Sequence, residues 1–201
     1  MIDCPFIVKI FEAFDLKPGR VFVFEYLRKG DLFSYINKHY VVKETVAWKI
    51  FTECLKGILY IHSLGIVHRD IKPENIMFGN DNHMKLIDFG LSKNNMFHMM
   101  RTFSSVGSLP YTAPEILARV GHYTPVDLWS LGVVYLAMTT GENPWLEESM
   151  MGLQREILFG TIRITTINNL EIRRCIAGFL NRDPDKRHSF VATQTDNILQ
   201  M

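Results

Sequence analysis

The chain has 201 residues, of which 47 % are hydrophobic and 21 % are charged, as in ordinary soluble globular proteins. This composition excludes a disordered tail, a coiled coil and a collagen-like fibre. The formal net charge of +1 excludes a strong overall attraction to nucleic acid or acidic lipid.

The cysteines, the hydropathy and the first residues indicate where the protein works. Three scattered cysteines are too few for a disulfide framework and indicate a reducing compartment. No apolar run is long enough to span a bilayer, and the first residues lack the basic and apolar regions of a signal peptide. We therefore predict an intracellular protein, cytoplasmic or nuclear, with no membrane or nucleic-acid partner and a monomeric state.

The first part of the chain is predicted to be a strand pair followed by helices. Residues 6–14 and 21–26 are apolar and β-prone, and Lys17-Pro18-Gly19 between them supplies a turn. Asp31 is expected to cap a short helix that ends near Asn37. Apolar residues at helical spacing predict a longer helix over 44–64, closed by Gly65.

The second part combines short strands, one long loop and a helical end. Strands are expected at 75–78 and 84–87, with a turn at 79–82 between them. Residues 91–112 are polar and patternless, and a loop of that length in a compact domain is usually functional. Apolar periodicity predicts four further helices, at 126–140, 147–159, 169–180 and 189–200.

Ionisable and amide side chains concentrate in residues 68–75, His-Arg-Asp-Ile-Lys-Pro-Glu-Asn. Asp88-Phe89-Gly90 follows directly behind the second short strand, and the intervening hairpin folds Asp88 back towards Asn75. One carboxylate beside one amide oxygen suits a hard cation such as Mg²⁺. Asp70 is then free to take a proton, and this division of labour fits phosphoryl transfer.

These segments, together with Ala113-Pro114-Glu115, resemble the protein kinase family over nearly the whole chain. The resemblance implies an α+β, protein-kinase-like fold, with a mainly helical large lobe and a remnant of the small-lobe β-sheet. It divides residues 1–201 into a small-lobe remnant (1–26), a hinge (27–30) and a large lobe (31–201). It also implies ATP and Mg²⁺ as cofactors, and protein substrates that accept phosphate on serine or threonine.

The resemblance assigns roles residue by residue. Asp70 is similar to the catalytic base and Lys72 to the lysine that steadies the transferred phosphate, in the form typical of serine/threonine kinases. Asn75 and Asp88 are similar to the Mg²⁺ ligands. Residues on the nucleotide side are also implied: Glu25, Tyr26 and Leu27 for the adenine-facing backbone, Phe24 as gatekeeper, Asp31 for ribose or a substrate arginine, and Leu32 and Met77 for the adenine ring.

Some of these positions also have purely structural interpretations. Asp31 is a natural helix cap, and Leu32 and Met77 would be core residues in any fold. His68, Asp127 and Trp129 are expected to be scaffold. Glu115 and Arg187 are expected to form a structural ion pair, because a half-made buried pair costs several kcal/mol.

The resemblance also suggests regulation and specificity. In such kinases the arginine that corresponds to Arg69 often binds a phosphate on the activation loop. Ser104, with Thr102 and Ser105 as neighbours, is the expected phosphosite. An unmodified, solvated Ser104 is the alternative. Ser108 lies where kinases keep a residue bonded to the catalytic aspartate and lysine.

Segments 107–115, 125–130 and 141–145 resemble the calmodulin-dependent-kinase-like group, which implies an arginine before the phosphoacceptor. Asp31 and Glu74 would be its acidic partners, unless Glu74 serves the hydrogen bonding of its own loop.

The glycine-rich loop, strand lysine and helix glutamate of the family have no counterpart in this sequence. Three interpretations follow. The chain is part of a serine/threonine kinase whose amino-terminal portion lies outside this sequence, a short form that binds substrates or regulators, or a lobe with weak activity of its own. The intact Asp70, Lys72, Asn75 and Asp88 favour the first.

Overall fold

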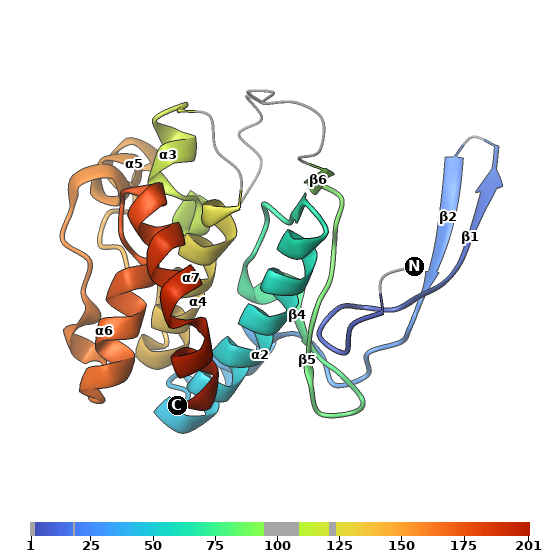
Figure 1. Cartoon of the computed structure of the whole chain (residues 1–201), viewed down its shortest axis with the longest axis horizontal. Helices are drawn as coiled ribbons and strands as arrows, with labels where there is room; N and C mark the ends of the chain where they lie inside the picture. The colour runs from blue at the N-terminus through green and yellow to red at the C-terminus, as the bar shows by residue number, and fades with distance from the viewer. Residues whose placement is uncertain (1–2, 18, 95–108, 121–123) are drawn as a thin grey trace.

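A computed structural model of the chain describes residues 3–17, 19–94, 109–120 and 124–201. Figure 1 shows a body of packed helices, from one end of which a two-stranded ribbon projects. The hairpin formed by strands β4 (Ile76–Phe78) and β5 (Met84–Leu86) lies between the helices and the ribbon. The described part of the chain therefore combines a helical body with three separate strand pairs.

Helix α4 (Pro125–Thr140) is the centre of the body. Every residue from Pro125 to Met138 is buried, as expected for a helix that is apolar on all sides. Three helices pack against it: α2 (Glu44–Ser63), α6 (Leu170–Phe179) and α7 (Pro184–Gln200). Gly141 ends α4 with a φ of +76°, a conformation that favours glycine.

Shorter helices cover the ends of this core. Asp31 caps α1 (Leu32–His39) by accepting a 2.7 Å hydrogen bond from the Ser34 N–H, as predicted. Helix α3 (Pro114–Leu117) and helix α5 (Met150–Phe159) contact each other at the other end of the body. Single 3₁₀ turns complete the helical set: η1 (Pro73–Asn75), η2 (Leu109–Tyr111) and η3 (Ile164–Thr166).

Two short antiparallel pairs lie against the body. Strand β4 (Ile76–Phe78) pairs with β5 (Met84–Leu86), with Met77 directly opposite Lys85. Strand β3 (Ile66–Val67) pairs with β6 (Lys93–Asn94), which lies inside the stretch predicted as loop. The β3–β6 pairing has no local sequence signal, because each strand has only two residues.

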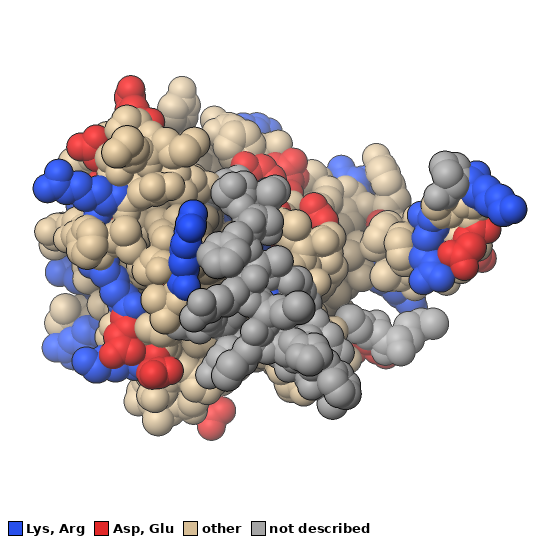
Figure 2. All heavy atoms as spheres, turned by 90° about the horizontal axis from the view of Figure 1, so that it is seen from above, with Lys and Arg blue, Asp and Glu red and all other residues tan. Residues whose placement is uncertain are grey.

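The third pair is the projecting ribbon. Strand β1 (Ile10–Leu16) pairs with β2 (Gly19–Phe24), and all of their described residues are exposed. Figure 2 shows the ribbon as an arm with charged side chains at its outer end, where Arg20 pairs with Asp15 at 2.6 Å. Large apolar side chains of the ribbon, including Phe14, Phe22 and Phe24, are 37–56 % exposed.

The predicted first strand, 6–14, differs from the observed one. Residues 5–8 leave the ribbon and lie along β5, where Val8 N–H donates to Leu86 O at 3.0 Å and Leu86 N–H donates to Phe6 O at 2.9 Å. Ile7 and Val8 are buried there. The apolar side chains of this segment therefore attach the chain to the body and do not extend the β1–β2 ribbon.

The predicted helices are present, with shifted ends. The last helix begins at Pro184 instead of residue 189, because Asp183 caps it and proline fits the first turn. Helix α5, predicted at 147–159, begins at Met150 instead, where Ser149 accepts a cap bond from the Gly152 N–H. Across the described ranges, no helix combines the length and apolarity needed to cross a membrane.

Candidate active site

The loop of residues 68–75 is held by a carboxylate from the central helix. Asp127 has no exposed surface, and its two oxygens accept 2.8 Å hydrogen bonds from the backbone N–H groups of His68 and Arg69. His62 Nε2, from α2, lies 2.8 Å from Asp127 Oδ2. Sequence reasoning took Asp127 as scaffold and missed His62. The available signal was a charged residue inside an otherwise apolar helix.

Burial alone would raise the pKa of Asp127, but hydrogen bonds from His62 and the loop, with the nearby His62 and His68, hold it below the ordinary value of 3.8. The loop that Asp127 anchors is also electrostatically coupled to it. Burial lowers the pKa of Arg69, and the Asp127 charge opposes that effect. A charged, fully bonded Asp127 thus fixes the start of the loop.

Two non-glycine residues of the site have left-handed backbones. Arg69 has φ +70° and Asp88 has φ +60°. Such conformations are uncommon outside glycine, asparagine and aspartate, and they cluster at functional sites. In Arg69 the conformation is held by the bond to Asp127, and in Asp88 it follows the end of β5.

His68 joins the loop to the strand that carries Asp88. Its Nε2 lies 2.9 Å from the Ile87 carbonyl, and its Nδ1 accepts a 3.3 Å bond from the Asp70 N–H. These two bonds are satisfied together by the neutral tautomer that is protonated at Nε2. The ring also packs against Phe89, with centroids 4.8 Å apart. His68 is therefore a buried structural link, as predicted.

Asp70 lies at the centre of a small polar network. Its Oδ2 accepts hydrogen bonds from Lys72 Nζ at 2.8 Å and from Asn75 Nδ2 at 2.9 Å. Asn75 Nδ2 also donates to the Asp70 carbonyl at 2.9 Å. Lys72 balances the charge of the carboxylate in a half-buried position. The structure thus brings the three polar loop residues together.

Asn75 comes just before β4 and Asp88 just after β5, so both lie at the open end of the β4–β5 hairpin. The Ile87 N–H donates to the Asn75 carbonyl at 3.0 Å, so that the residue before Asp88 is fixed beside Asn75. Asn75 is buried, and Asp88 is exposed with Oδ1 accepting from the Gly90 N–H at 3.0 Å. Because Asn75 donates through Nδ2, its amide oxygen is the atom suited to a cation.

This donor set fits Mg²⁺, which is usually held by one or two carboxylates together with water and substrate phosphate oxygens. The described residues include no cluster of three or more His, Cys, Asp or Glu side chains that would hold a metal without such help. One carboxylate and one amide oxygen leave the other positions around such an ion to water and phosphate oxygens.

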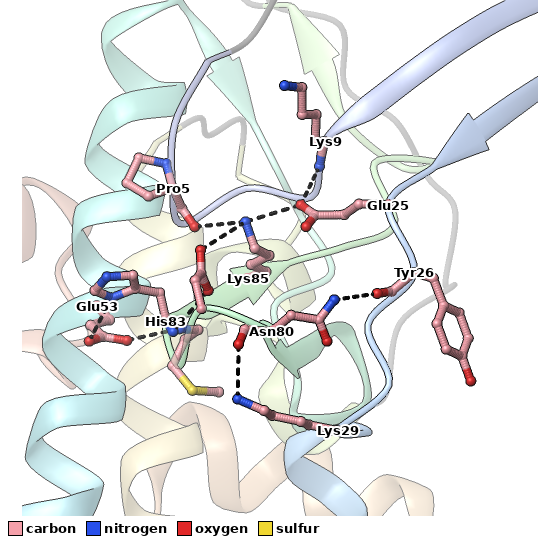
Figure 3. Close-up of polar contacts among 11 residues, drawn as sticks. Pro5, Lys9, Glu25, Tyr26, Lys29, Glu53, Asn80, His83 and Lys85 are labelled. Carbon is pink, nitrogen blue, oxygen red and sulfur yellow. Dashed lines mark hydrogen bonds and ion pairs between the residues drawn. The ribbon is translucent and has the colours of Figure 1, made fainter.

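The expected nucleotide-side residues lie near the base of the ribbon. Leu27 is buried, Glu25 and Met77 are partly buried, and Asp31 pairs with Met77 in an antiparallel bridge. Both Asp31 carboxylate oxygens bond to Ser34 as a helix cap. Leu32 has no exposed surface, which supports its interpretation as a core residue. Figure 3 shows Glu25 turned towards Lys85.

The substrate and regulatory candidates divide into two groups. Glu74 is exposed beside Tyr111, whose pKa is raised by burial and by the Glu74 charge. Ser104 and Ser108, with Thr102 and Ser105, lie outside the described residues. Further along, Arg187 donates to both oxygens of Glu115 at 2.6 and 2.9 Å, which confirms the predicted buried pair.

The fold and this arrangement of loop, hairpin and buried ion pair define a class of protein. The chain matches the protein kinase domain family over residues 1–199 and belongs to that family. Its α+β, kinase-like fold is confirmed. Among the relatives that it resembles are ribosomal protein S6 kinases and a protein named as a serine/threonine-protein kinase.

Relatives of several kinds share this similarity. Ribosomal protein S6 kinase alpha-1 of Homo sapiens is 33 % identical over 92 % of this chain and 25 % of its own length. Ribosomal protein S6 kinase alpha-3 of Mus musculus is 35 % identical over 96 % and 28 %. CBL-interacting serine/threonine-protein kinase 12 of Arabidopsis thaliana is 35 % identical over 92 % and 38 %. The chain thus spans well under half of each relative.

Proposed function

We propose that this chain carries the phosphoryl-transfer centre of a kinase that acts on serine and threonine hydroxyls of protein substrates, with ATP and Mg²⁺ as cofactors. The network around Asp70 carries the proposal, since Lys72 and Asn75 both donate to its carboxylate. Few scaffold roles would require a lysine and an amide on one half-buried aspartate.

The proposed reaction joins the substrate hydroxyl oxygen to the γ-phosphorus of ATP and breaks the bond to the bridging oxygen of ADP. Asp70 takes the hydroxyl proton, and Lys72 stabilises the charge on the transferred phosphoryl oxygens. Asn75 and Asp88 are the residues that would hold Mg²⁺, which would neutralise phosphate charge when bound. Glu25, Leu27, Asp31 and Met77 are proposed to line the nucleotide site.

The substrate preference is proposed to be an arginine before the phosphoacceptor. The exposed Glu74 and the cap residue Asp31 would supply its acidic partners. A small hollow lined by Phe33, Pro73, Tyr111 and Glu142 lies next to the segment of Glu74 and has room for a side chain. This preference agrees with the resemblance to the calmodulin-dependent-kinase-like group, and within it to checkpoint kinase 1.

Two serine peptides that differ only by arginine or alanine before the phosphoacceptor test this specificity. With the arginine peptide, Glu74→Gln is expected to raise KM with little change in kcat. With the alanine peptide, the variant and the wild type should agree. Equal KM values for both peptides in the wild type would contradict the arginine preference.

Regulation through Arg69 and Ser104 is a further part of the proposal. A phosphate on Ser104 would offer oxygens that a guanidinium recognises, and would thereby order the loop. Mass spectrometry of the active, purified chain is expected to find phosphate on Ser104. An active chain in which Ser104 is always unmodified would contradict this mechanism.

One observation favours a second function. The exposed apolar side chains of the ribbon, such as Phe14 and Phe22, are typical of a surface that another protein covers. A chain that binds the arginine peptide but transfers no phosphate would be a substrate- or regulator-binding module. Peptide affinity measured alongside transfer therefore separates the two functions.

A further inference from the structure

A buried lysine on β5 joins the ribbon to the hairpin that carries the proposed metal ligands. Lys85 Nζ lies 3.0 Å from Glu25 Oε1, 3.8 Å from Asp81 Oδ2, and donates to the Pro5 carbonyl at 3.1 Å. Its side chain is only 7 % exposed. Figure 3 shows the ammonium between the segment of Pro5 and the side chain of Glu25. A buried ammonium is costly without such acceptors.

Glu25 in turn joins the two strands at the base of the ribbon. Its Oε1 accepts a 2.8 Å bond from the Lys9 N–H, and its own N–H donates to the Lys9 carbonyl at 2.9 Å. Lys9 immediately precedes β1, and Glu25 immediately follows β2. The Lys85–Glu25 pair therefore acts at the point where the ribbon joins the body.

The turn of the hairpin makes a second set of contacts with the same region. Asn80 Nδ2 donates to the Tyr26 carbonyl at 2.7 Å, and Lys29 Nζ donates to Asn82 Oδ1 at 2.6 Å. Burial would raise the pKa of Asp81, but the His83 N–H bond and the charges of Lys85 and His83 lower it overall. Asp81 thus adds negative charge beside the ammonium.

The hairpin itself is attached to the body. Glu53 of α2 accepts a 2.8 Å bond from the Met84 N–H, and its other oxygen lies 3.2 Å from His83 Nδ1. Figure 3 shows these contacts on the side of the hairpin opposite to Tyr26. The path from α2 through β5 to Glu25 is therefore continuous.

We propose that Lys85 is a positioning residue for nucleotide binding. It fixes the position of residues 25–27 relative to Asn75 and Asp88, which flank the β4–β5 hairpin at its open end. Met77, opposite Lys85 in the ladder, projects from the same face of the hairpin. This inference rests on the proposed function, because it concerns the distance between adenine-facing and phosphate-facing groups.

Pulsed electron paramagnetic resonance on the Cys4→Ser chain tests the position directly. Spin labels at Glu12→Cys on the ribbon and Thr45→Cys on α2 report the distance between ribbon and body, since both sites are exposed. The parent chain is expected to give one narrow distance distribution. Lys85→Met should broaden or shift it, and the exposed α2 substitution Lys49→Met should leave it unchanged.

Affinity for a fluorescent ADP analogue with Mg²⁺ is the second measurement. If the competent arrangement falls to about a tenth of the molecules, the apparent affinity falls about tenfold. We expect this loss for Lys85→Met and no loss for Lys49→Met. Glu25→Gln, which removes the ion pair and keeps the other contacts of Lys85, is the second variant if Lys85→Met does not fold.

The outcomes separate the two proposals. A distance distribution that is identical in the wild type and in the folded Lys85→Met or Glu25→Gln chain would overturn the positioning role. A changed distribution with unchanged nucleotide affinity would overturn it as well. A wild-type chain that binds no nucleotide would instead contradict the proposed function.

Discussion

Asp127 Oδ1, inside the central helix, accepts a 2.8 Å hydrogen bond from the backbone N–H of Arg69, whose φ is +70°. A fully buried carboxylate thereby holds a non-glycine residue of the site in the left-handed conformation. Asp70 follows Arg69 directly, so that the position of the proposed catalytic base depends on this bond.

Asp127→Asn is expected to lower the free energy of unfolding by about 1–3 kcal/mol, because an amide can accept only one of the two loop N–H bonds through oxygen. Its NH₂ group would face the other donor. Urea unfolding at neutral pH measures the change. Equal stability of the variant and the wild type would contradict the anchoring role.

The same comparison has a defined dependence on pH. The pKa of Asp127 is lowered in the folded chain, so its charge contributes stability that is present above the unfolded value of 3.8 and is lost as pH falls through the folded pKa. The stability difference between wild type and Asp127→Asn should therefore be constant near neutrality and shrink below about pH 4. A difference that grows in acid would contradict this assignment.

The Glu115–Arg187 pair provides a stability prediction away from the loop. Glu115→Ala leaves a fully buried guanidinium without its carboxylate, and should cost about 3–5 kcal/mol. The double variant Glu115→Ala with Arg187→Met should lose less than the sum of the single variants. Additive losses in a double-mutant cycle would show that the two side chains do not interact.

Hydrogen exchange should distinguish the ribbon from the central helix. A two-stranded ribbon exposed on both faces has little stability of its own. We expect amides of β1 and β2 to exchange much faster than those of α4. Equal protection would contradict an exposed ribbon and indicate that a second copy or partner covers it.

The three cysteines should react very differently in the native chain. Cys4 is partly buried, whereas Cys54 and Cys175 are 1 % and 4 % exposed. Burial raises the pKa of Cys175 to about 12, and burial with the Glu53 charge raises that of Cys54 further. One thiol should therefore be alkylated readily before denaturation and three after it. Rapid native labelling of Cys54 would contradict the packing of α2.

Much of this architecture could be predicted from local patterns. The central helix, predicted at 126–140, occupies Pro125–Thr140, because continuous apolar residues between a proline and a glycine mark both ends. The clustered side chains of residues 68–75 and Asp88 likewise pointed to phosphoryl transfer. In these segments, local sequence and tertiary structure favour the same conformation.

The remaining features depend on contacts between distant residues. Glu25 and Lys85 are 60 residues apart in the sequence, and neither has a local signal for an ion pair. His62 of α2 contacts Asp127 of α4, and the two residues are far apart in the sequence. Residues 5–8 are β-prone, but they hydrogen-bond to the edge of β5 and do not extend the β1–β2 ribbon. Such choices are made by tertiary packing, which periodicity does not encode.

The most direct test of the account is Mg²⁺-ATP-dependent phosphate transfer to an arginine-containing serine peptide by the purified chain. Asp70→Asn is measured beside it, with circular dichroism to show that both chains are folded. We predict transfer by the wild type and a loss of about 10²–10⁴-fold in the variant, the range typical of a general base. Equal transfer by the two folded chains would contradict Asp70 as the base. No transfer by the folded wild type would contradict an active centre in this chain on its own.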